Sequence, residues 1–377
     1  QIADLHIHSR YSMATSKDGT PEMLDLWARK KGITLLGTGD MTHPIWRQEL
    51  KAKLIPAEQG LFRLKEEYVL PEAARYPGKA PRFVLSGEIS SIYKKGGKTR
   101  KVHSLILLPG FDEADAFAAR LEKIGNIHSD GRPILGLPCH DLLEIMLEVS
   151  EEGIYIPAHI WTPHFSLFGA KSGFDTIEEC FEELTPYIHA LETGLSSDPA
   201  MNWQISALDG YQLVSHSDAH SPSKLGREAD LLDIELSYQG LWDAVQNGKG
   251  LEGTIEFFPE EGKYHFDGHR KCGVCLSPKE AEMYNGICPV CGKKLTMGVD
   301  HRILQLSDRD ESSAVMPESG RPYESLGAEF TILREVPPED IRKAGGEVLA
   351  EGIRRLRAGE VVRKPGSDGE YGKIELF

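Results

Sequence analysis

The stretch DLHIHS at residues 4–9 decides how the rest of this sequence is interpreted. His6 and His8 alternate along a strand-like run, 2–8, so both imidazoles are expected to leave the same face of the strand. Two imidazoles placed in this way can share one divalent ion. An isolated HxH pair is weak evidence, because a histidine in a strand is often merely hydrogen-bonded. The interpretation therefore depends on what accompanies the pair.

The first 258 residues alternate strand-like apolar runs with helix-like stretches such as 20–32 and 111–124. Repeated strand–helix units predict an α/β fold with a largely parallel sheet, open or closed into a barrel. Several runs end in histidine or carboxylate residues, at the edge where such folds carry their chemistry. These residues are Asp40 and His43 in GTGDMTHP, Glu88 in LSGEIS, His103 in KVHSL, His159 and His164 in PAHIWTPH, and Asp218 and His220 in SHSDAHS.

Histidine and carboxylate ligands without cysteine suit a catalytic ion such as Zn, Mn or Fe rather than a closed structural site. A carboxylate such as Glu88 can bridge two ions, and clustered ions can clamp a phosphoryl oxygen and activate a bound water. The set therefore predicts metal-assisted hydrolysis of a phosphoester. For any single histidine, chance is the preferred explanation. For His43 and His164, chance and a ligand role are equally good explanations. For five residues together, chance is a poor explanation: His6, His8, Glu88, Asp218 and His220. Six further histidines show no comparable pattern and are predicted to be structural: His128, His140, His189, His265, His269 and His301.

Composition narrows the class of protein. With 377 residues, two domains or one large barrel with an appendage are expected. The net charge of −15 argues against a protein that coats polyanions, although a local basic groove would still allow nucleic acid as a substrate. No apolar run reaches about 18 residues, and the first residues lack the features of a secretory signal. Four of the six cysteines cluster, which suggests metal binding in a reducing, cytoplasmic compartment.

The cysteine cluster predicts a separate zinc module. Cys272 and Cys275 form one CxxC pair, and Cys288 and Cys291 form a second pair twelve residues later. Four thiolates at this spacing are typical of a tetrahedral structural zinc. The expected organisation is a barrel at 1–258, a zinc module at 259–306, a linker at 307–327 and a helical C-terminal region at 328–377. Whether the zinc module touches DNA or only braces the helices stays open.

A basic hairpin is expected at 93–103, YKKGGKTRKVH, between the strands that carry Glu88 and His103. A solvated turn with ordinary surface charge is one explanation. Contact with a DNA phosphate backbone is the preferred one, because the hairpin is tied at both ends to expected metal ligands. Its basic residues are Lys94, Lys95, Lys98, Arg100 and Lys101.

The motifs DLHIHS, GTGD, SGEIS, VHSL, AHIW and SDAH resemble, in this order, those of the PHP (polymerase and histidinol phosphatase) superfamily. The resemblance implies a distorted (β/α)7 barrel with two or three divalent ions, Zn, Mn or Mg, at the strand ends. One ion would be held by His6, His8, Glu88 and Asp218, a second by Glu88, His103 and His159, and a third with the help of His220. Ala14 and Met41 depart from the family pattern at the third site, so Asp40 and His43 would have to complete it.

Within this superfamily the chain resembles endonuclease Q, through GTGDMTHP, HIWTPHFSLFGAKSGFD, SDAHSPSKLGREA, the cysteine cluster and the ending PGSDGEYGKI. That likeness implies nicking of DNA on the 5′ side of uracil, hypoxanthine or abasic sites, with Asp198 as a catalytic carboxylate. Asp198 followed by Pro199 is also a good helix N-cap. The alternative activity is that of a phosphatase on a small phosphorylated metabolite, and a third is a degenerate site in a DNA-binding scaffold. No protein partner is indicated.

Overall fold

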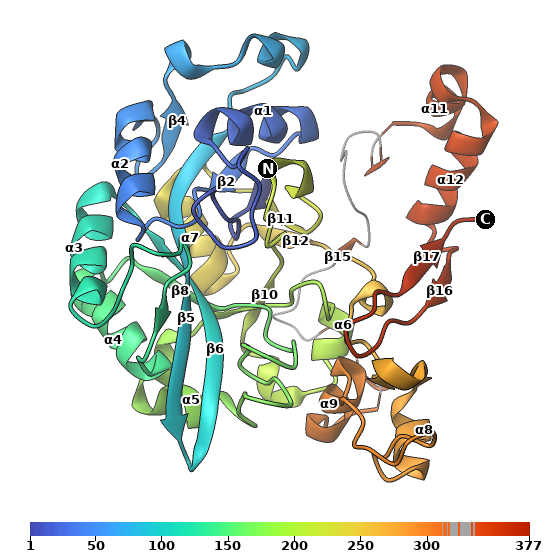
Figure 1. Cartoon of the computed structure of the whole chain (residues 1–377). Coiled ribbons are helices and arrows are strands. Elements are labelled where there is room, and N and C mark those ends of the chain that lie inside the picture. Colours follow the sequence, from blue (N-terminus) through green and yellow to red (C-terminus); the bar gives the residue numbers. More distant parts are fainter. Residues whose placement is uncertain (311, 315, 317–322, 325–332, 335) are drawn as a thin grey trace.

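The computed structural model describes residues 1–310, 312–314, 316, 323–324, 333–334 and 336–377. It is a mixed α/β fold in which helices surround a central sheet (Figure 1). Among the described residues, no helix combines the length and the apolar character needed to span a membrane.

The strands of the main body are short, apart from one long pair. Their bounds are β1 (Ile2–Asp4), β2 (Leu35–Gly37), β3 (Leu54–Pro56), β4 (Phe62–Leu64), β5 (Arg82–Lys95), β6 (Lys98–Leu108), β7 (Ile134–Leu135), β8 (Ile154–Pro157), β9 (Ala190–Glu192), β10 (Gln212–Val214), β11 (Ala229–Leu232) and β12 (Leu251–Ile255). β5 and β6 form an antiparallel ribbon that projects from the body, at the bottom of Figure 1.

Strand pairing and backbone contacts connect seven of these strands in the order of the chain: β1, β2, β5, β6, β8, β9 and β10. β1 pairs in parallel with β2 and β2 with β5, whereas β6 pairs antiparallel with both β5 and β8. β9 and β10 pair in parallel as a separate two-stranded sheet. Ile160, just after β8, donates its backbone N–H to the carbonyl of Glu192 in β9, and Ile7, just after β1, bridges in parallel to Ala219 after β10. Backbone contacts therefore link β8 to β9 and β10 back to β1.

Helices cover the outside of this strand arrangement. The helices of the main body are α1 (Pro21–Lys31), α2 (Pro44–Lys53), α3 (Phe111–Glu122), α4 (Cys139–Val149), α5 (Ile177–Phe181), α6 (Pro199–Asn202) and α7 (Tyr238–Asn247). α1 shows why such segments are helical: the Thr20 side chain caps its N-terminus, Pro21 follows, and Gly32 ends it with φ +82°. The apolar faces of the helices pack on the sheet around fully buried side chains such as Trp46, Phe117 and Trp161.

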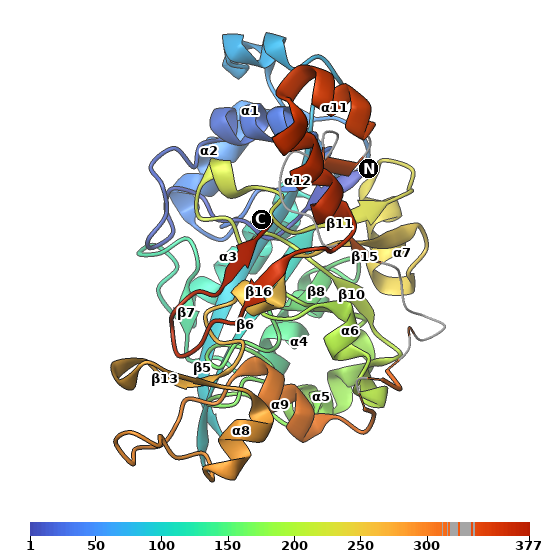
Figure 2. The same cartoon turned by 90° about the vertical axis from the view of Figure 1, so that its right-hand side faces the viewer.

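The remainder of the chain lies along one side of the main body (Figures 1 and 2). Its elements are β13 (Asp267–His269), β14 (Val274–Leu276), α8 (Pro278–Met283), α9 (Val299–Leu306), β15 (Tyr323–Glu324), α11 (Pro338–Gly345), α12 (Glu347–Arg357), β16 (Val362–Lys364) and β17 (Lys373–Glu375). Most of the predicted linker at 307–327 lies outside the described residues, but β15 within it pairs with β12. The domain boundaries expected at 258, 306 and 327 stay predictions.

The β16–β17 hairpin is fastened to the chain that leaves the main body. Gly366 donates its N–H to the Glu260 carbonyl, and Gly372 donates to the Glu261 carbonyl. A Cβ at Gly372 would lie 2.1 Å from the Glu260 oxygen, so only glycine allows the two backbones to approach this closely. The C-terminal hairpin is therefore packed against the segment that leaves the main body rather than separate from it.

Candidate metal centre

The predicted ligands lie just beyond short strands or inside the long ribbon. His6 and His8 follow β1, His159 follows β8 and Asp218 follows β10, whereas Glu88 and His103 lie within β5 and β6. The strand expected at 2–8 is shorter than predicted, ending at Asp4. Three of the predicted ligands have positive φ: Asp40 (49°), His159 (29°) and Asp218 (46°). Backbone strain of this kind persists only where surrounding contacts hold it, and it is concentrated at functional sites.

His6, His8, Glu88 and Asp218 form a first group, whose ligand atoms lie within 4.8 Å of one another. Nε2 of His8 lies 3.0 Å from Asp218 Oδ1 and 3.2 Å from Glu88 Oε2. Nε2 of His6 lies 3.5 Å from the same Glu88 oxygen. The two imidazoles and Glu88 are buried, and Asp218 keeps an exposed edge.

Glu88, His103 and His159 form a second group. Oε1 of Glu88 lies 2.6 Å from His103 Nδ1 and 3.2 Å from His159 Nε2. Each oxygen of Glu88 therefore faces a different group. This is the geometry that a carboxylate bridging two cations requires.

Two further carboxylates contact the Nδ1 atoms of His6 and His8, on the side of each ring opposite the ligand atom Nε2. Glu192 accepts from His6 Nδ1, with both oxygens at 3.0 Å, and Asp40 lies 3.2 Å from His8 Nδ1. A carboxylate on Nδ1 fixes the tautomer that leaves the lone pair on Nε2, as at metal sites. Nε2 of His6 is buried and has no hydrogen-bond partner among the described residues. A bound cation would satisfy this atom, so the residues present fit a divalent ion.

The electrostatics of the centre also favour a cation. Burial opposes a charge on His6 and His8, but the carboxylates around them outweigh it and hold the pKa of both imidazoles well above the usual range. At His103 burial prevails over Glu88 and lowers the pKa to about 4. Burial tends to raise the pKa of Glu88, yet the neighbouring His103 and Arg132 hold it well below its ordinary value. A neutral His103 and an ionised Glu88 are the forms that bind metal.

Glu192 was missed in the sequence, although it is the last residue of strand β9. A carboxylate at the end of a strand in a repeated strand–helix fold is the signal that could have identified it. It also accepts hydrogen bonds from the His159 backbone N–H and from His216 Nδ1, both at 2.8 Å. His216 in turn contacts Asp230 at 3.1 Å. Glu192 therefore connects both groups to a buried charged network.

Asp40 and His43, predicted as ligands of a third ion, are not brought to the two groups. Asp40 lies behind His8, and its oxygens accept from Ser9 N, Ser9 Oγ and Ser12 Oγ at 2.6–2.9 Å. His43 is the N-cap of α2: its Nδ1 accepts from Trp46 N, and its Nε2 donates to the His128 carbonyl at 3.0 Å. The polar atoms of both residues have protein partners in this structure, and their place at a third ion stays a prediction.

His220 lies beside the first group without joining it. Its ring centroid is 4.5 Å from that of His8, and its Nδ1 donates to the Asp218 carbonyl at 2.9 Å. A cavity of about 1000 Å³ opens over both groups. It is lined by His103, His159, His164, Asp218 and His220, and also by Arg132, Lys263 and Tyr371 from other segments.

Asp198, predicted as catalytic, lines a different cavity together with Glu260, His265 and Arg363. Its Oδ1 accepts from Met201 N at 2.9 Å and caps α6. Burial raises the pKa of this carboxyl. The geometry described is that of a helix cap, and the catalytic role stays a prediction.

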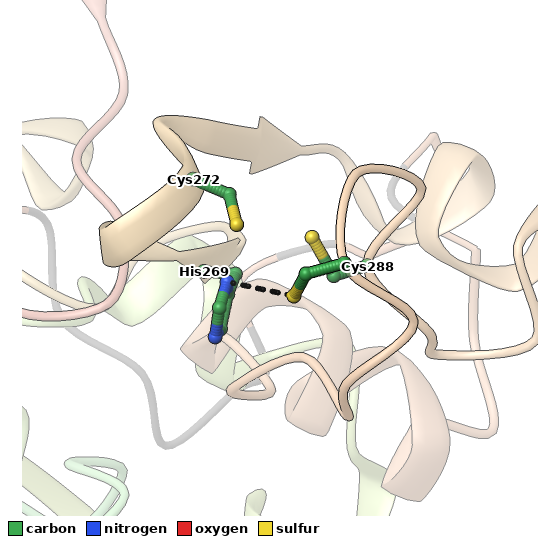
Figure 3. Close-up of side chains that lie close together, drawn as sticks. His269, Cys272 and Cys288 are labelled. Atoms are coloured by element: carbon green, nitrogen blue, oxygen red, sulfur yellow. Dashed lines mark hydrogen bonds between the residues drawn. The ribbon is translucent and has the colours of Figure 1, made fainter.

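The ligand cluster in the predicted zinc module differs from the four-cysteine prediction at one position. His269, Cys272, Cys288 and Cys291 have ligand atoms within 4.8 Å of one another, and Cys275 is not among them. Figure 3 shows His269, Cys272 and Cys288 converging, and His269 Nδ1 lies 3.6 Å from Cys291 Sγ. The Cys275 thiol instead lies 3.8 Å from the Pro365 carbonyl. His269 was predicted to be structural, and its place in this group was missed.

Strand register explains the exchange. His269 pairs with Val274 in the β13–β14 hairpin, and Cys275 pairs with Gly268. Because side chains alternate between faces, His269 and Cys275 leave opposite faces of the hairpin. Two similar turns result, His269-x-x-Cys272-Gly and Cys288-x-x-Cys291-Gly, with φ +62° at Gly273 and +70° at Gly292. The signal in the sequence was the glycine after the second ligand of each turn.

The basic hairpin forms as predicted at the end of the β5–β6 ribbon, and its cations differ in availability. Lys94 and Lys98 are exposed. Lys95 pairs with Glu182, and Arg100 donates to the Gly173 carbonyl and stacks 4.1 Å from the Phe174 ring centroid. Lys101 Nζ lies 5.1 Å from the ring centroid of Phe165. Lys94 and Lys98 are the members best placed to meet an external anion.

Proteins similar to this chain occur among curated sequences and solved structures, although no protein-family model matches it. The crystal structure of the lesion-specific endonuclease PfuEndoQ from Pyrococcus furiosus gives a TM-score of 0.84 at 27% identity, covering 99% of this chain and 94% of that one. The chain has the endonuclease Q fold. Endonuclease Q in complex with a 27-mer duplex substrate with an abasic lesion at the active site also gives a TM-score of 0.84, at 28% identity, covering 99% of this chain and 96% of that one. The uncharacterized protein YqxK of Bacillus subtilis strain 168 is 28% identical, covering 99% of this chain and 98% of YqxK.

The likeness to endonuclease Q drawn from the sequence is thereby confirmed. The match extends over the zinc module and the C-terminal hairpin as well as the strands that carry the metal-ligand groups. The endonuclease Q fold therefore describes nearly the whole chain.

Proposed function

We propose that this chain is a metal-dependent endonuclease that hydrolyses a DNA phosphodiester on the 5′ side of deaminated bases, such as uracil and hypoxanthine, or of abasic sites. The observation that carries the proposal is the likeness, over 99% of the chain, to endonuclease Q bound to a duplex with an abasic lesion at the active site. Two ligand groups that share Glu88 below one cavity support the same reaction class.

The residues have distinct roles in this proposal. His6, His8, Asp218 and Oε2 of Glu88 would hold one divalent ion, and Oε1 of Glu88 with His103 and His159 would hold another. Bound ions would activate a water and polarise a phosphoryl oxygen. Glu192 and Asp40 keep the Nδ1 protons of His6 and His8 in place and so orient both rings. His220 is the remaining candidate for a third ion, as the resemblance implies.

Two finer structural proposals accompany this one. The ring of β1, β2, β5, β6, β8, β9 and β10 supports a distorted (β/α)7 barrel, in which the antiparallel β6 is the distortion. The cluster of thiols with one imidazole supports a structural zinc held by His269, Cys272, Cys288 and Cys291. Zinc held by thiolates fits a reducing compartment such as the cytoplasm.

DNA contact by the β5–β6 hairpin rests on its charge and position. Lys94 and Lys98 are exposed at the end of the ribbon that also carries Glu88 and His103. Exposed lysines contact phosphates without reading sequence, and each contact adds to the salt dependence of binding. A Lys94→Gln/Lys98→Gln variant should bind duplex DNA more weakly, with a smaller slope of log affinity against log salt. An unchanged slope would exclude the hairpin from the interface.

Hydrolysis of a small phosphorylated metabolite is the alternative, and nothing specific favours it. The decisive assay incubates the protein with Mn²⁺ or Mg²⁺ and labelled duplexes containing uracil, hypoxanthine or an abasic site, beside an undamaged duplex and a chromogenic phosphomonoester. Nicking on the 5′ side of the lesion supports the proposal. Rapid monoester hydrolysis without nicking would overturn it.

A further inference from the structure

Arg132 lies in the metal centre although no motif pointed to it. Its Nη1 donates to Glu88 Oε2 at 3.0 Å, the oxygen that faces His6 and His8. The side chain is 23% exposed and lines the cavity over both ligand groups. A guanidinium is therefore placed where the scissile phosphate of the proposed reaction would enter.

The loop that carries Arg132 is held rigidly. Asp130 Oδ1 accepts from both Arg132 N and Met13 N at 3.1 Å. A Cβ at Gly131 would lie 2.2 Å from Asp40 Oδ2, so the backbone packs directly on the carboxylate behind His8. The Pro133 carbonyl then accepts a hydrogen bond from the backbone N–H of Ser90, which lies two residues after Glu88 in β5. From Ile134 onward, β7 pairs with β5. These contacts pre-organise the side chain and lower the entropy lost when it binds an anion.

The donors of Arg132 are only partly used by the protein. A guanidinium carries five N–H donors in a planar fork that matches the oxygens of a phosphate. Among the described residues, Glu88 accepts a hydrogen bond from one nitrogen of this guanidinium, Nη1. A cation held by Glu88 Oε2 would compete with Arg132 for the lone pairs of this oxygen and would repel the guanidinium. The N–H donors of Arg132 would then be available to an anion in the cavity.

We propose that Arg132 is a catalytic residue that donates hydrogen bonds to a non-bridging oxygen of the scissile phosphate. The inference rests on the proposed endonuclease activity. Charge on the non-bridging oxygens must be neutralised as the phosphoryl group is transferred, and a fixed arginine does this where water is excluded. A role limited to neutralising Glu88 is the competing explanation, and it makes different predictions.

The test uses single-turnover cleavage of an abasic-site duplex in Mn²⁺ by wild type, Arg132→Gln and Arg132→Lys. Arg132→Gln should be about 100-fold slower, and Arg132→Lys, which keeps the charge but loses the fork, should recover part of this loss. The metal content and melting temperature of both variants should match those of the wild type. Arg120→Gln, an exposed arginine paired with Glu148 on the outer surface, is the control variant and should cleave normally.

Stereopure phosphorothioates at the scissile linkage supply the readout that separates the two roles. One diastereomer should slow the wild type because sulfur accepts hydrogen bonds poorly, and this effect should disappear in Arg132→Gln. Mn²⁺ tolerates sulfur, so the metal contribution to the effect is small. A full sulfur effect in Arg132→Gln, or a loss of bound metal, would overturn the proposal in favour of a role through Glu88. If the wild type nicks no lesion duplex, the proposed function itself fails and this inference fails with it.

Discussion

Glu192 lies directly behind His6, with both carboxylate oxygens 3.0 Å from Nδ1 of the imidazole. The same carboxylate accepts the backbone N–H of His159 at 2.8 Å. One buried side chain therefore orients a ligand of the first group and the backbone of a ligand of the second. Burial opposes its charge, but His6 and His216 prevail and lower the pKa of Glu192 to about 2.

Glu192→Gln should weaken metal binding without removing a ligand. An amide can present its NH₂ group to His6 and so favour the wrong tautomer, and loss of such a partner typically reduces metal affinity about 10–100-fold. Metal titration followed by calorimetry would measure the change. Glu183→Gln, which alters a surface carboxylate paired with His140, is the matched control and should bind metal as the wild type does. Equal affinity in the Glu192 and Glu183 variants would remove Glu192 from the centre.

Glu88→Gln should impair both groups, because each carboxylate oxygen faces a different one. Asp218→Asn should affect the first group alone, since Asp218 takes no part in the second. Elemental analysis after dialysis would give the number of ions retained by each variant, with the proposed structural zinc as the internal reference. Loss of the same number of ions from both variants would contradict a bridging role for Glu88.

His269→Ala should lose zinc, and Cys275→Ser should retain it. The structure places the His269 ring among three thiols and the Cys275 thiol near the Pro365 carbonyl. Release of zinc can be followed with a chromogenic chelator, and the melting temperature should fall in His269→Ala because structural zinc contributes directly to folding. Zinc loss from Cys275→Ser with retention by His269→Ala would restore the four-cysteine site.

Glu256 should make the protein less stable as the pH rises. Its carboxyl is 1% exposed, and burial raises the pKa to about 8 although Ser215 and Thr193 donate hydrogen bonds to it. A raised folded-state pKa means that the native state holds a proton that the unfolded state releases. The contribution of Glu256 to the free energy of unfolding is therefore complete below the ordinary pKa of about 4.5 and is lost as the pH rises through about 8. The free energy of unfolding then falls by at most ~1.4 kcal/mol per pH unit.

Denaturant unfolding between pH 5 and 9, about the range of that transition, would measure this slope. Glu256→Gln should flatten the curve, because the amide is neutral throughout. Glu252→Gln, on strand β12 just before Glu256 but exposed, should leave it unchanged. An identical pH dependence in Glu256→Gln and the wild type would show that Glu256 is ionised in the native state at neutral pH.

Asp198→Asn separates capping from catalysis. Asparagine caps helices as well as aspartate does, so the variant should keep its stability, whereas Asp198→Ala should lose ~1 kcal/mol. If Asp198 is the catalytic carboxylate that the resemblance implies, Asp198→Asn should nick DNA at least about 100-fold more slowly while retaining its metal content. Nicking at close to the wild-type rate would limit Asp198 to the cap of α6.

Local patterns in the sequence were sufficient to predict the metal ligands that lie on one element or on two neighbouring strands. His6 and His8 are two residues apart, and both reach the first group, as the alternation predicted, although β1 ends at Asp4. Glu88 and His103 lie on adjacent strands of one hairpin, and a short turn fixes their register. The order of motifs along the chain was also enough to identify the likeness to endonuclease Q.

Only the tertiary structure decided which residues support those ligands. Glu192 and Arg132 come from segments far from His6 and Glu88 in the chain, and their roles appear only once the strands and loops are packed together. The fold makes His43, a predicted ligand, the cap of a helix, and it directs Cys275 to the face of its hairpin opposite His269. Residue type and spacing determine which side chains can bind a metal; burial and the competing hydrogen bonds of the folded chain determine which of them are free to do so.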